Sequence, residues 1–509
     1  MLELTIFALG ILLIDLMLPK EWKWVNALIA LVGLAFAAGA VLGTPLIGRF
    51  QILGVYPYVM RLRLIGQGGQ LALSGSIIVD GLTAYFWMLF LAGTSIAIAM
   101  SVRYLRIEDE QHGEYYALLL LSVVGMMCMS AGADIVLIFI GLELMAVSTY
   151  VLVGFLRRDR RSNEAALKYL LLGAFSSGIF AFGLSLFYGL TNSTNLFAIQ
   201  RSLAGLVRKD PHNPVILIAL LTTMVGLLFK VAAIPFHQWA PDAYEGAPTS
   251  ITGFMSVAVK AAAWAMLLRI LVYGLFPLRA LYTPVIVVVA IATMTGANFA
   301  ALTQSNTKRL LAYSSIAHVG YMLLAFVAMG TSQPNSPGFL DGFKGILIYL
   351  LVYTFMNLGA FAVITSLRQR KVIGDEIDDL AGLYKRAPVE AALMLLFLLS
   401  LAGIPPAAGF LGKYYIFLSL IESGHYALAS LGVFYSLFGL YYYLKIANAM
   451  LMRAPMETER LPISFGMRCA VGVSALATIV IGVYPEPFIS GVNWSLGIAQ
   501  SPHVAVMMR

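Results

Sequence analysis

The chain has 509 residues, of which 60% are hydrophobic and only 11% are charged, against about 25% charged residues in an ordinary globular protein. This chain has too few polar groups to cover its surface as a soluble protein does. Most of its surface must therefore face lipid. Soluble enzymes, disordered proteins and nucleic-acid-binding domains are therefore excluded, and the net charge of +8 becomes a sign of membrane topology.

Fourteen apolar segments are long enough to cross a membrane as helices, since a bilayer core takes roughly 20 residues. The runs are continuously apolar, unlike the alternating strands of a membrane barrel. The sequence thus predicts an all-α polytopic membrane protein of about 14 spans. They lie near 2–19, 24–43, 77–102, 115–132, 134–156, 165–190, 214–246, 247–273, 282–302, 308–330, 341–367, 389–424, 427–452 and 465–491.

The two longest connections are 44–76 and 191–213, and no soluble domain is predicted. Gly66, Gly68 and Gly69, within an alternating pattern, favour a small hairpin in the first connection. With the N-terminus outside, inner connections hold 18 lysines and arginines, outer connections hold 10, and the other five of the 33 lie inside spans. Because positive residues favour the cytoplasmic side, both termini are predicted outside.

The five lysines inside spans are Lys168, Lys230, Lys260, Lys413 and Lys445. A cation at mid-bilayer costs roughly 2.5–3.5 kcal/mol on insertion scales and usually faces a wet interior and a partner. Lys230, Lys260 and Lys413 are far from any span end, and Glu143 is a carboxylate well inside a span. Burial disfavours the charged form of either group, whereas pairing favours it. A lysine that gains and loses a carboxylate partner would therefore bind and release protons in steps.

Other charged residues have simpler interpretations. Lys445 is near an inner span end, where its ammonium group can extend to the headgroups. Lys168 follows Glu164 by four residues, so either such an extension or a local ion pair is expected. Asp80 and Asp134 lie at outer span ends and are predicted to be helix caps or interface residues.

Proline interrupts two unusually long spans, at Pro235 in the seventh and at Pro405 and Pro406 in the twelfth. Proline frees the carbonyl four residues earlier, here those of Val231 and Leu401. Unwound backbone at membrane depth is tolerated only where it is buried in protein or lines water. Two matching breaks favour an inverted-repeat transporter, although two unrelated kinks remain an alternative.

The odd offset between spans seven and twelve places the two copies in opposite orientations. We therefore predict an N-terminal three-helix segment, two five-helix repeats and a C-terminal helix. Their ranges are 1–109, 110–273, 274–455 and 456–509.

Two histidines are candidate proton relays, because the unperturbed pKa of histidine is near 6.5. His318 falls near the middle of the tenth span, and His237 follows Pro235 by two residues. The alternative for each is a lone histidine bonded to a neighbour. Tyr349 and Asn357, with Tyr353 between them, are spaced to share one helix face, where they could hold a water wire or simply pack.

No sequence pattern indicates a bound cofactor or metal. Two cysteines, Cys128 and Cys469, are too few for a disulfide framework or an iron–sulfur site. Phosphate-binding, dinucleotide-binding and nucleophile-elbow motifs are absent from the sequence. The energy source is therefore expected to be an ion gradient or a partner.

Five runs carry a resemblance to a known family; they are GLELMAVSTYVLVGF, EAALKYLLLGAFSSG, KVAAIPFHQWAPDAYEGAPTSIT, NTKRLLAYSSIAHVGYML and LAGIPPAAGFLGKYYIF. The chain resembles the antiporter-like membrane subunits of respiratory complex I, among them the subunit N family. The resemblance implies fourteen helices, two inverted five-helix repeats and broken seventh and twelfth helices. It also implies that Glu143 pairs with Lys230, that Lys168 modulates this pair, and that Lys260 and Lys413 continue a central hydrophilic axis.

The function implied is proton translocation in the membrane arm of an NADH–quinone oxidoreductase, driven by quinone reduction. The resemblance places NADH, flavin, iron–sulfur clusters and quinone in other subunits and none in this chain. Its expected neighbours are subunit M-like and subunit K- or J-like proteins and lipid, in a bacterial inner membrane, so the chain is no free monomer. The alternatives are a multi-subunit cation/proton antiporter, a membrane-bound hydrogenase arm and a passive scaffold.

Overall fold

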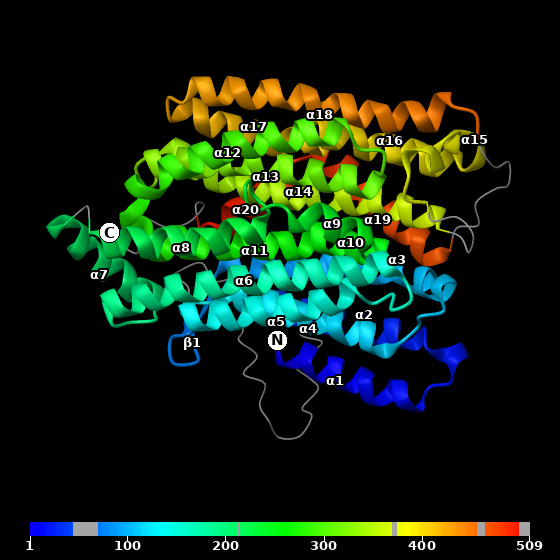
Figure 1. Cartoon of the computed structure of the whole chain (residues 1–509), viewed down its shortest axis with the longest axis horizontal. Helices are drawn as coiled ribbons and strands as arrows, with labels where there is room; N and C mark the ends of the chain where they lie inside the picture. Colours follow the sequence, from blue (N-terminus) through cyan, green and yellow to red (C-terminus); the bar gives the residue numbers. More distant parts are fainter. Residues whose placement is uncertain (44–69, 211–212, 369–373, 456–463, 498–509) are drawn as a thin grey trace.

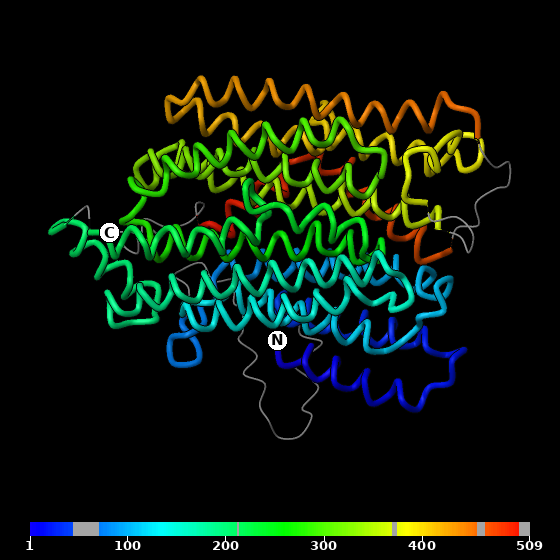
Figure 2. Tube along the Cα trace, in the orientation of Figure 1, coloured from blue at the N-terminus to red at the C-terminus, as the bar shows by residue number. Residues whose placement is uncertain are grey.

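The computed structural model describes residues 1–43, 70–210, 213–368, 374–455 and 464–497. Helices lie side by side along the long axis of Figure 1, and α1 and α18 form opposite edges of the trace in Figure 2. Their apolar faces merge into one large buried cluster that runs through the bundle. Within the described residues the fold is therefore all-helical, apart from one hairpin.

Within the described ranges, 12 helical stretches are long and apolar enough to span a membrane. Two predicted spans fall outside this group: α1 has only 16 residues, and the twelfth is split into two short helices. Counting both brings the number of spans to 14, as predicted. The first helices are α1 (Leu2–Met17), α2 (Val25–Leu42), α3 (Gly81–Glu108), α4 (Gly113–Ala131), α5 (Ile135–Val153) and α6 (Arg160–Thr191).

The remaining helices continue in chain order. Those of the middle region are α7 (Leu196–Lys209), α8 (Pro214–Val231), α9 (Trp239–Gly246), α10 (Thr249–Phe254), α11 (Lys260–Leu268), α12 (Arg279–Leu302), α13 (Thr307–Thr331) and α14 (Pro337–Leu367). Those of the last region are α15 (Leu383–Arg386), α16 (Pro388–Ala402), α17 (Ala408–Glu422), α18 (Tyr426–Met452), α19 (Phe465–Val483) and α20 (Glu486–Ser495). Two π-helical segments, η3 (Met255–Val259) and η4 (Arg269–Gly274), interrupt the eighth span.

The structure corrects two of the predicted connections. The hairpin consists of β1 (Gln70–Ala72) and β2 (Ile77–Val79), antiparallel with Leu71 opposite Ile78, whereas Gly66, Gly68 and Gly69 lie outside the described residues. The third span accordingly begins at Gly81, not at 77. The connection 191–213 contains α7, which packs Leu196, Ile199 and Leu203 against the bundle. A search for continuous apolar runs misses such a helix, because only one of its faces is apolar.

Matching features in the two halves support the proposed repeats. Asp134 caps α5 and forms a β-bridge with Asn195, before α7. Asn306 caps α13 and forms a β-bridge with Glu376, before α15. In Figure 1, α7 and α15 lie at opposite ends of the bundle, as inversion requires. We retain the division at residues 110, 274 and 456 as a proposal.

A buried ion pair ties three helices together near the hairpin. Asp80 caps α3 by accepting from the Thr83 amide at 2.7 Å, which confirms its predicted capping role. Its carboxylate also accepts from Arg269 at 2.6 and 2.8 Å, and Arg269 Nε donates to the Ser130 carbonyl at the end of α4. Arg269 falls at the outer end of the predicted span 247–273 and is counted with the cations of the outer side, but it is only 1% exposed. Because Arg269 lies near a span end, the sequence did not indicate that it is buried.

Candidate functional site

The first helix break positions Lys230 in the core. The helix α8 ends at Val231 because Ala232 adopts a left-handed conformation with φ of 63°, and Pro235 prevents the helix from resuming at once. The chain becomes helical again at Trp239, whose indole nitrogen donates to the Phe229 carbonyl at 2.9 Å. This bond satisfies backbone near the break and leaves Lys230 in the last turn of α8.

The Lys230 ammonium group lies among aromatic side chains. It donates to the Tyr169 hydroxyl at 3.3 Å and lies 5.9 Å from the centre of the Tyr150 ring. An adjacent cavity of about 10 Å³, lined in part by Ser176 and Ser177, is close to the minimum for one water. Lys230 therefore has neutral partners and room for about one water beside them.

Glu143 does not pair directly with Lys230. Both residues are described, and their charged atoms do not come within 4.0 Å of each other. One oxygen of Glu143, Oε1, is buried without a hydrogen-bond partner. The helix α5 instead presents Tyr150, two turns further along, to the lysine. The ion pair implied by the family resemblance is thus absent from this conformation.

Lys168 lies in a charged pocket that opens at the solvent-accessible surface of the bundle. Its side chain is 47% exposed and pairs with Glu164 at 2.8 Å and with Asp242 at 3.1 Å, which confirms the local ion pair. Arg309 from α13 bridges Asp242 and Glu245 at 2.8 and 2.9 Å. The pocket has a volume of about 210 Å³ and is also lined by Arg161. It therefore holds three cations and three carboxylates, and its charges cancel.

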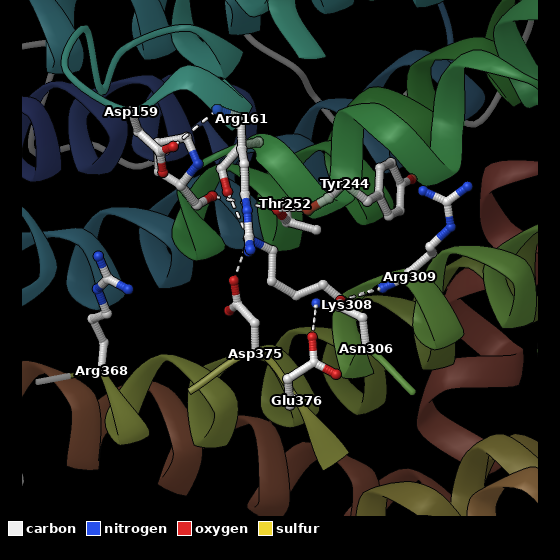
Figure 3. A network of polar contacts seen from close by, with 12 residues as sticks. Asp159, Arg161, Tyr244, Thr252, Asn306, Lys308, Arg309, Arg368, Asp375 and Glu376 are labelled. Atoms are coloured by element: carbon white, nitrogen blue, oxygen red, sulfur yellow. Dashed lines mark hydrogen bonds and ion pairs between the residues drawn. The ribbon is translucent and has the colours of Figure 1, made fainter. Parts of the chain in front are cut away.

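Polar contacts link the end of α9 to the second repeat. Figure 3 shows Lys308 extended toward Asp375, and its ammonium group also donates to the Ala247 carbonyl at 2.8 Å. Burial raises the pKa of the Asp375 carboxyl, although Lys308 and Arg368 favour its charged form. Lys308 therefore connects the first broken helix to the segment that precedes the second.

Lys260 lies deep in the eighth span, immediately after the π-helical segment η3. Its ammonium group donates to the Ser315 carbonyl at 3.0 Å and to the Ser315 hydroxyl. Single-turn π segments often occur at functional sites. Between this site and Lys230 lies Tyr244 of α9, which is within interaction range of both Tyr169 and Ser315.

His318 is hydrogen-bonded on both ring nitrogens. One contacts the Tyr349 hydroxyl and the other the Tyr443 hydroxyl, which lies 3.0 Å away and also bonds Ser314. His318 is close enough to Lys260 and Lys413 to experience both charges. The position of His318 within a hydrogen-bonded chain is what a relay requires, and its partner Tyr349 is a contact that the sequence did not predict.

The second break holds Lys413. Gly403 ends α16 with φ of 85°, and Lys413 donates to the freed carbonyl of Ala402 at 2.7 Å, one residue after the predicted Leu401. The ammonium group also lies 5.2 Å from the centre of the Tyr321 ring. Lys230, Lys260 and Lys413 are 4%, 4% and 6% exposed, so all three predicted deep lysines are buried.

The other predicted residues are placed more simply. His237 is half-buried at the first break, and its Nδ1 is buried without a hydrogen-bond partner. Asn357 donates to Ser256 at 2.7 Å, whereas the Tyr353 hydroxyl is buried and unpaired. Lys445 donates to the Gln304 carbonyl at 2.8 Å. In the described part of the chain, no cluster of three or more His, Cys, Asp or Glu is placed to hold a metal ion.

Residues 132–439 match the family model described as NADH:quinone oxidoreductase/Mrp antiporter, TM. The NADH-quinone oxidoreductase subunit N 1 of Koribacter versatilis (strain Ellin345) is 58% identical over 509 residues, which are 100% of this chain and 96% of the relative. A chain of respiratory complex I from Thermus thermophilus with bound aureothin is 31% identical with a TM-score of 0.76, covering 96% and 98% of the two chains. A chain of the Mrp complex from Dietzia sp. DQ12-45-1b is 19% identical with a TM-score of 0.79, covering 99% of each, and shows likeness of fold alone.

Proposed function

This chain belongs to the NADH:quinone oxidoreductase/Mrp antiporter family, as a relative of its subunit N proteins, and we propose that Lys230, Lys260 and Lys413 carry protons through it. It is a multi-pass membrane subunit of a complex I assembly, in which quinone reduction drives proton pumping. The main support for this proposal is the set of hydrogen-bond partners of the three ammonium groups. Each is buried and held by a hydroxyl or a carbonyl, not by a carboxylate.

A buried cation without a counter-ion is costly. A small change in the surrounding charge is therefore enough to alter whether each lysine holds its proton. Glu143 has one buried oxygen without a hydrogen-bond partner and lies two turns before Tyr150 on α5, so it is the carboxylate we assign to that change. Movement of Glu143 toward Lys230 would stabilise the ammonium form, and its withdrawal would release the proton.

The hydrogen-bonded groups suggest an order of transfer. The charged pocket at Lys168 is the proposed inlet from the cytoplasm, and Lys230 is the first deep site. Tyr169 and Tyr244 lead toward Lys260 and Ser315. The lateral path then continues to His318, which bonds Tyr349 and Tyr443. Tyr321, whose ring contacts both His318 and Lys413, leads on to Lys413.

Stepwise transfer fits the energetics. Moving one charge against 100 mV costs about 2.3 kcal/mol, whereas coupling between two sites typically supplies 1–3 kcal/mol. Coupling between several linked sites therefore supplies this energy together. We propose that the redox groups and the quinone lie in other subunits, that M-like and K- or J-like subunits flank this chain, and that both termini face outward from a bacterial inner membrane.

Replacing Lys230 or Glu143 by alanine tests the proposal in the intact complex. Proton uptake into sodium-free vesicles and quinone reduction are measured together, and each variant is expected to lower the number of protons moved per quinone reduced. Undiminished pumping with a normal quinone reductase rate would refute the assigned roles. A strict sodium requirement in the unmodified complex would instead favour the cation/proton antiporter alternative.

Gly403→Ala is expected to impair the second break. An added Cβ would lie 2.8 Å from Lys413 Cδ and 3.2 Å from its Nζ, which displaces the ammonium group from the Ala402 carbonyl. The left-handed backbone adds about 1–2 kcal/mol of strain. Gly424→Ala is the matched control, because Gly424 has φ of 79° with nothing within 4 Å of the added Cβ.

Both alanine variants should lower thermal stability, because both add the same kind of backbone strain. Only Gly403→Ala should also lower proton pumping per quinone reduced, measured in vesicles. Equal pumping in the two variants would show that the position of Lys413 does not matter.

A further inference from the structure

A groove opens between α16 and α19, at the end of the bundle where α15 lies (Figure 1). Its volume is about 620 Å³, within the range of roughly 300–1,000 Å³ common for small-molecule sites. Lys385, Arg386 and Arg468 line it together with a single carboxylate, Glu390. Arg386 is buried and has a partner of its own, so Lys385 and Arg468 are the cations that the groove offers to a ligand.

The start of α16 adds to this positive character. Pro388 is its first residue, and Ala387 before it offers no side-chain cap. The first amides of an α-helix have no partner within the helix, and the helix dipole places a partial positive charge there. Anions are accordingly favoured at this position.

Part of the lining of the groove is apolar. Leu393 lies on α16, and Val471 and Gly472 lie on α19. A Cβ added at Gly472 would meet nothing within 4 Å, so the space beside it is open. Further along α19, Val473 and Leu476 are exposed on a helix long and apolar enough to span the membrane. The groove thus combines a cationic rim with an apolar floor near the lipid-facing surface.

We propose that this groove binds an anionic phospholipid, with the phosphate between Lys385 and Arg468 and an acyl chain beside Gly472. Basic pockets between membrane helices on the cytoplasmic side suit anionic headgroups. The pocket at Lys168 provides the contrast, because Lys168 and Arg309 pair with carboxylates there and the three cations of that pocket are balanced by three carboxylates. A free phosphate would use the rim but would leave the apolar floor uncovered.

The test compares the intact complex in nanodiscs of phosphatidylglycerol with the same complex in phosphatidylcholine nanodiscs and inorganic phosphate. Density maps are expected to show a headgroup at Lys385 and Arg468, continuous with an acyl chain beside Gly472, in the first preparation only. Lys385→Gln with Arg468→Gln removes two charges at about 1 kcal/mol each, and should weaken retention of phosphatidylglycerol roughly 30-fold.

Two further variants separate the effects of charge and shape. Gly472→Leu fills the open space without changing charge, and should displace the acyl chain while the complex still assembles. Arg157→Gln with Arg158→Gln removes two exposed charges from the loop before α6, and should leave this lipid in place. An empty groove, equal occupancy by phosphatidylcholine, isolated phosphate density, or a neighbouring subunit filling the groove would each overturn the proposal.

Discussion

Lys260→Met is expected to abolish coupled proton translocation, with a reduction of roughly 100-fold or more, since positioned proton-transfer groups typically contribute that much. Methionine fills a similar volume but neither binds a proton nor donates to Ser315. The carbonyl and hydroxyl of Ser315 would lose their contacts with the ammonium group, which interrupts the path between Tyr244 and His318. Proton uptake and quinone reduction by the same vesicles provide the measurement.

Lys445→Met is the matched control for this experiment. Lys445 also lies within a predicted span, but its ammonium group donates to carbonyls of Leu302 and Gln304 at the end of α12. Its loss removes the same charge without interrupting the proposed path, and pumping should persist. If Lys260→Met pumps as well as Lys445→Met, Lys260 does not relay protons.

Arg269→Met is expected to destabilise the subunit by about 3–5 kcal/mol, the usual cost of leaving one member of a buried ion pair without its partner. Arg269 is buried, and Asp80 would lose both of its contacts with the guanidinium group. The Ser130 carbonyl would lose its Nε donor as well. The junction between the third, fourth and eighth spans should then unfold first on heating.

Thermal unfolding of the purified complex, followed by release of this subunit, measures the effect. Adding Asp80→Asn to Arg269→Met removes the uncompensated charge and should recover part of the loss. Arg453→Met serves as the control, because Arg453 and Asp378 form an exposed pair and such pairs contribute only about 0–1 kcal/mol. Equal stability of Arg269→Met and Arg453→Met would contradict the assigned role of the buried pair.

Several residues of the proposed path escaped the sequence analysis for one shared reason. Tyr169, Tyr244 and Tyr443 contact or adjoin the proposed path, yet each is an ordinary aromatic residue within an apolar run. A tyrosine in such a run either packs against lipid or supplies a hydroxyl to the interior. The only local signal was the position of Tyr169 beside Lys168, and it does not decide which way the ring points.

The sequence alone determined the number of spans, both helix breaks, the caps at Asp80 and Asp134, and the burial of the three deep lysines. These properties are local, because each depends on a continuous apolar run, a proline or a charge far from the span ends. Only the tertiary structure decided that Lys230 meets Tyr169 and not Glu143, that Arg269 is buried against Asp80, and that a cationic groove forms beside α16. Partners across helices depend on the rotation and depth of each helix, which packing between distant segments sets and hydropathy does not encode.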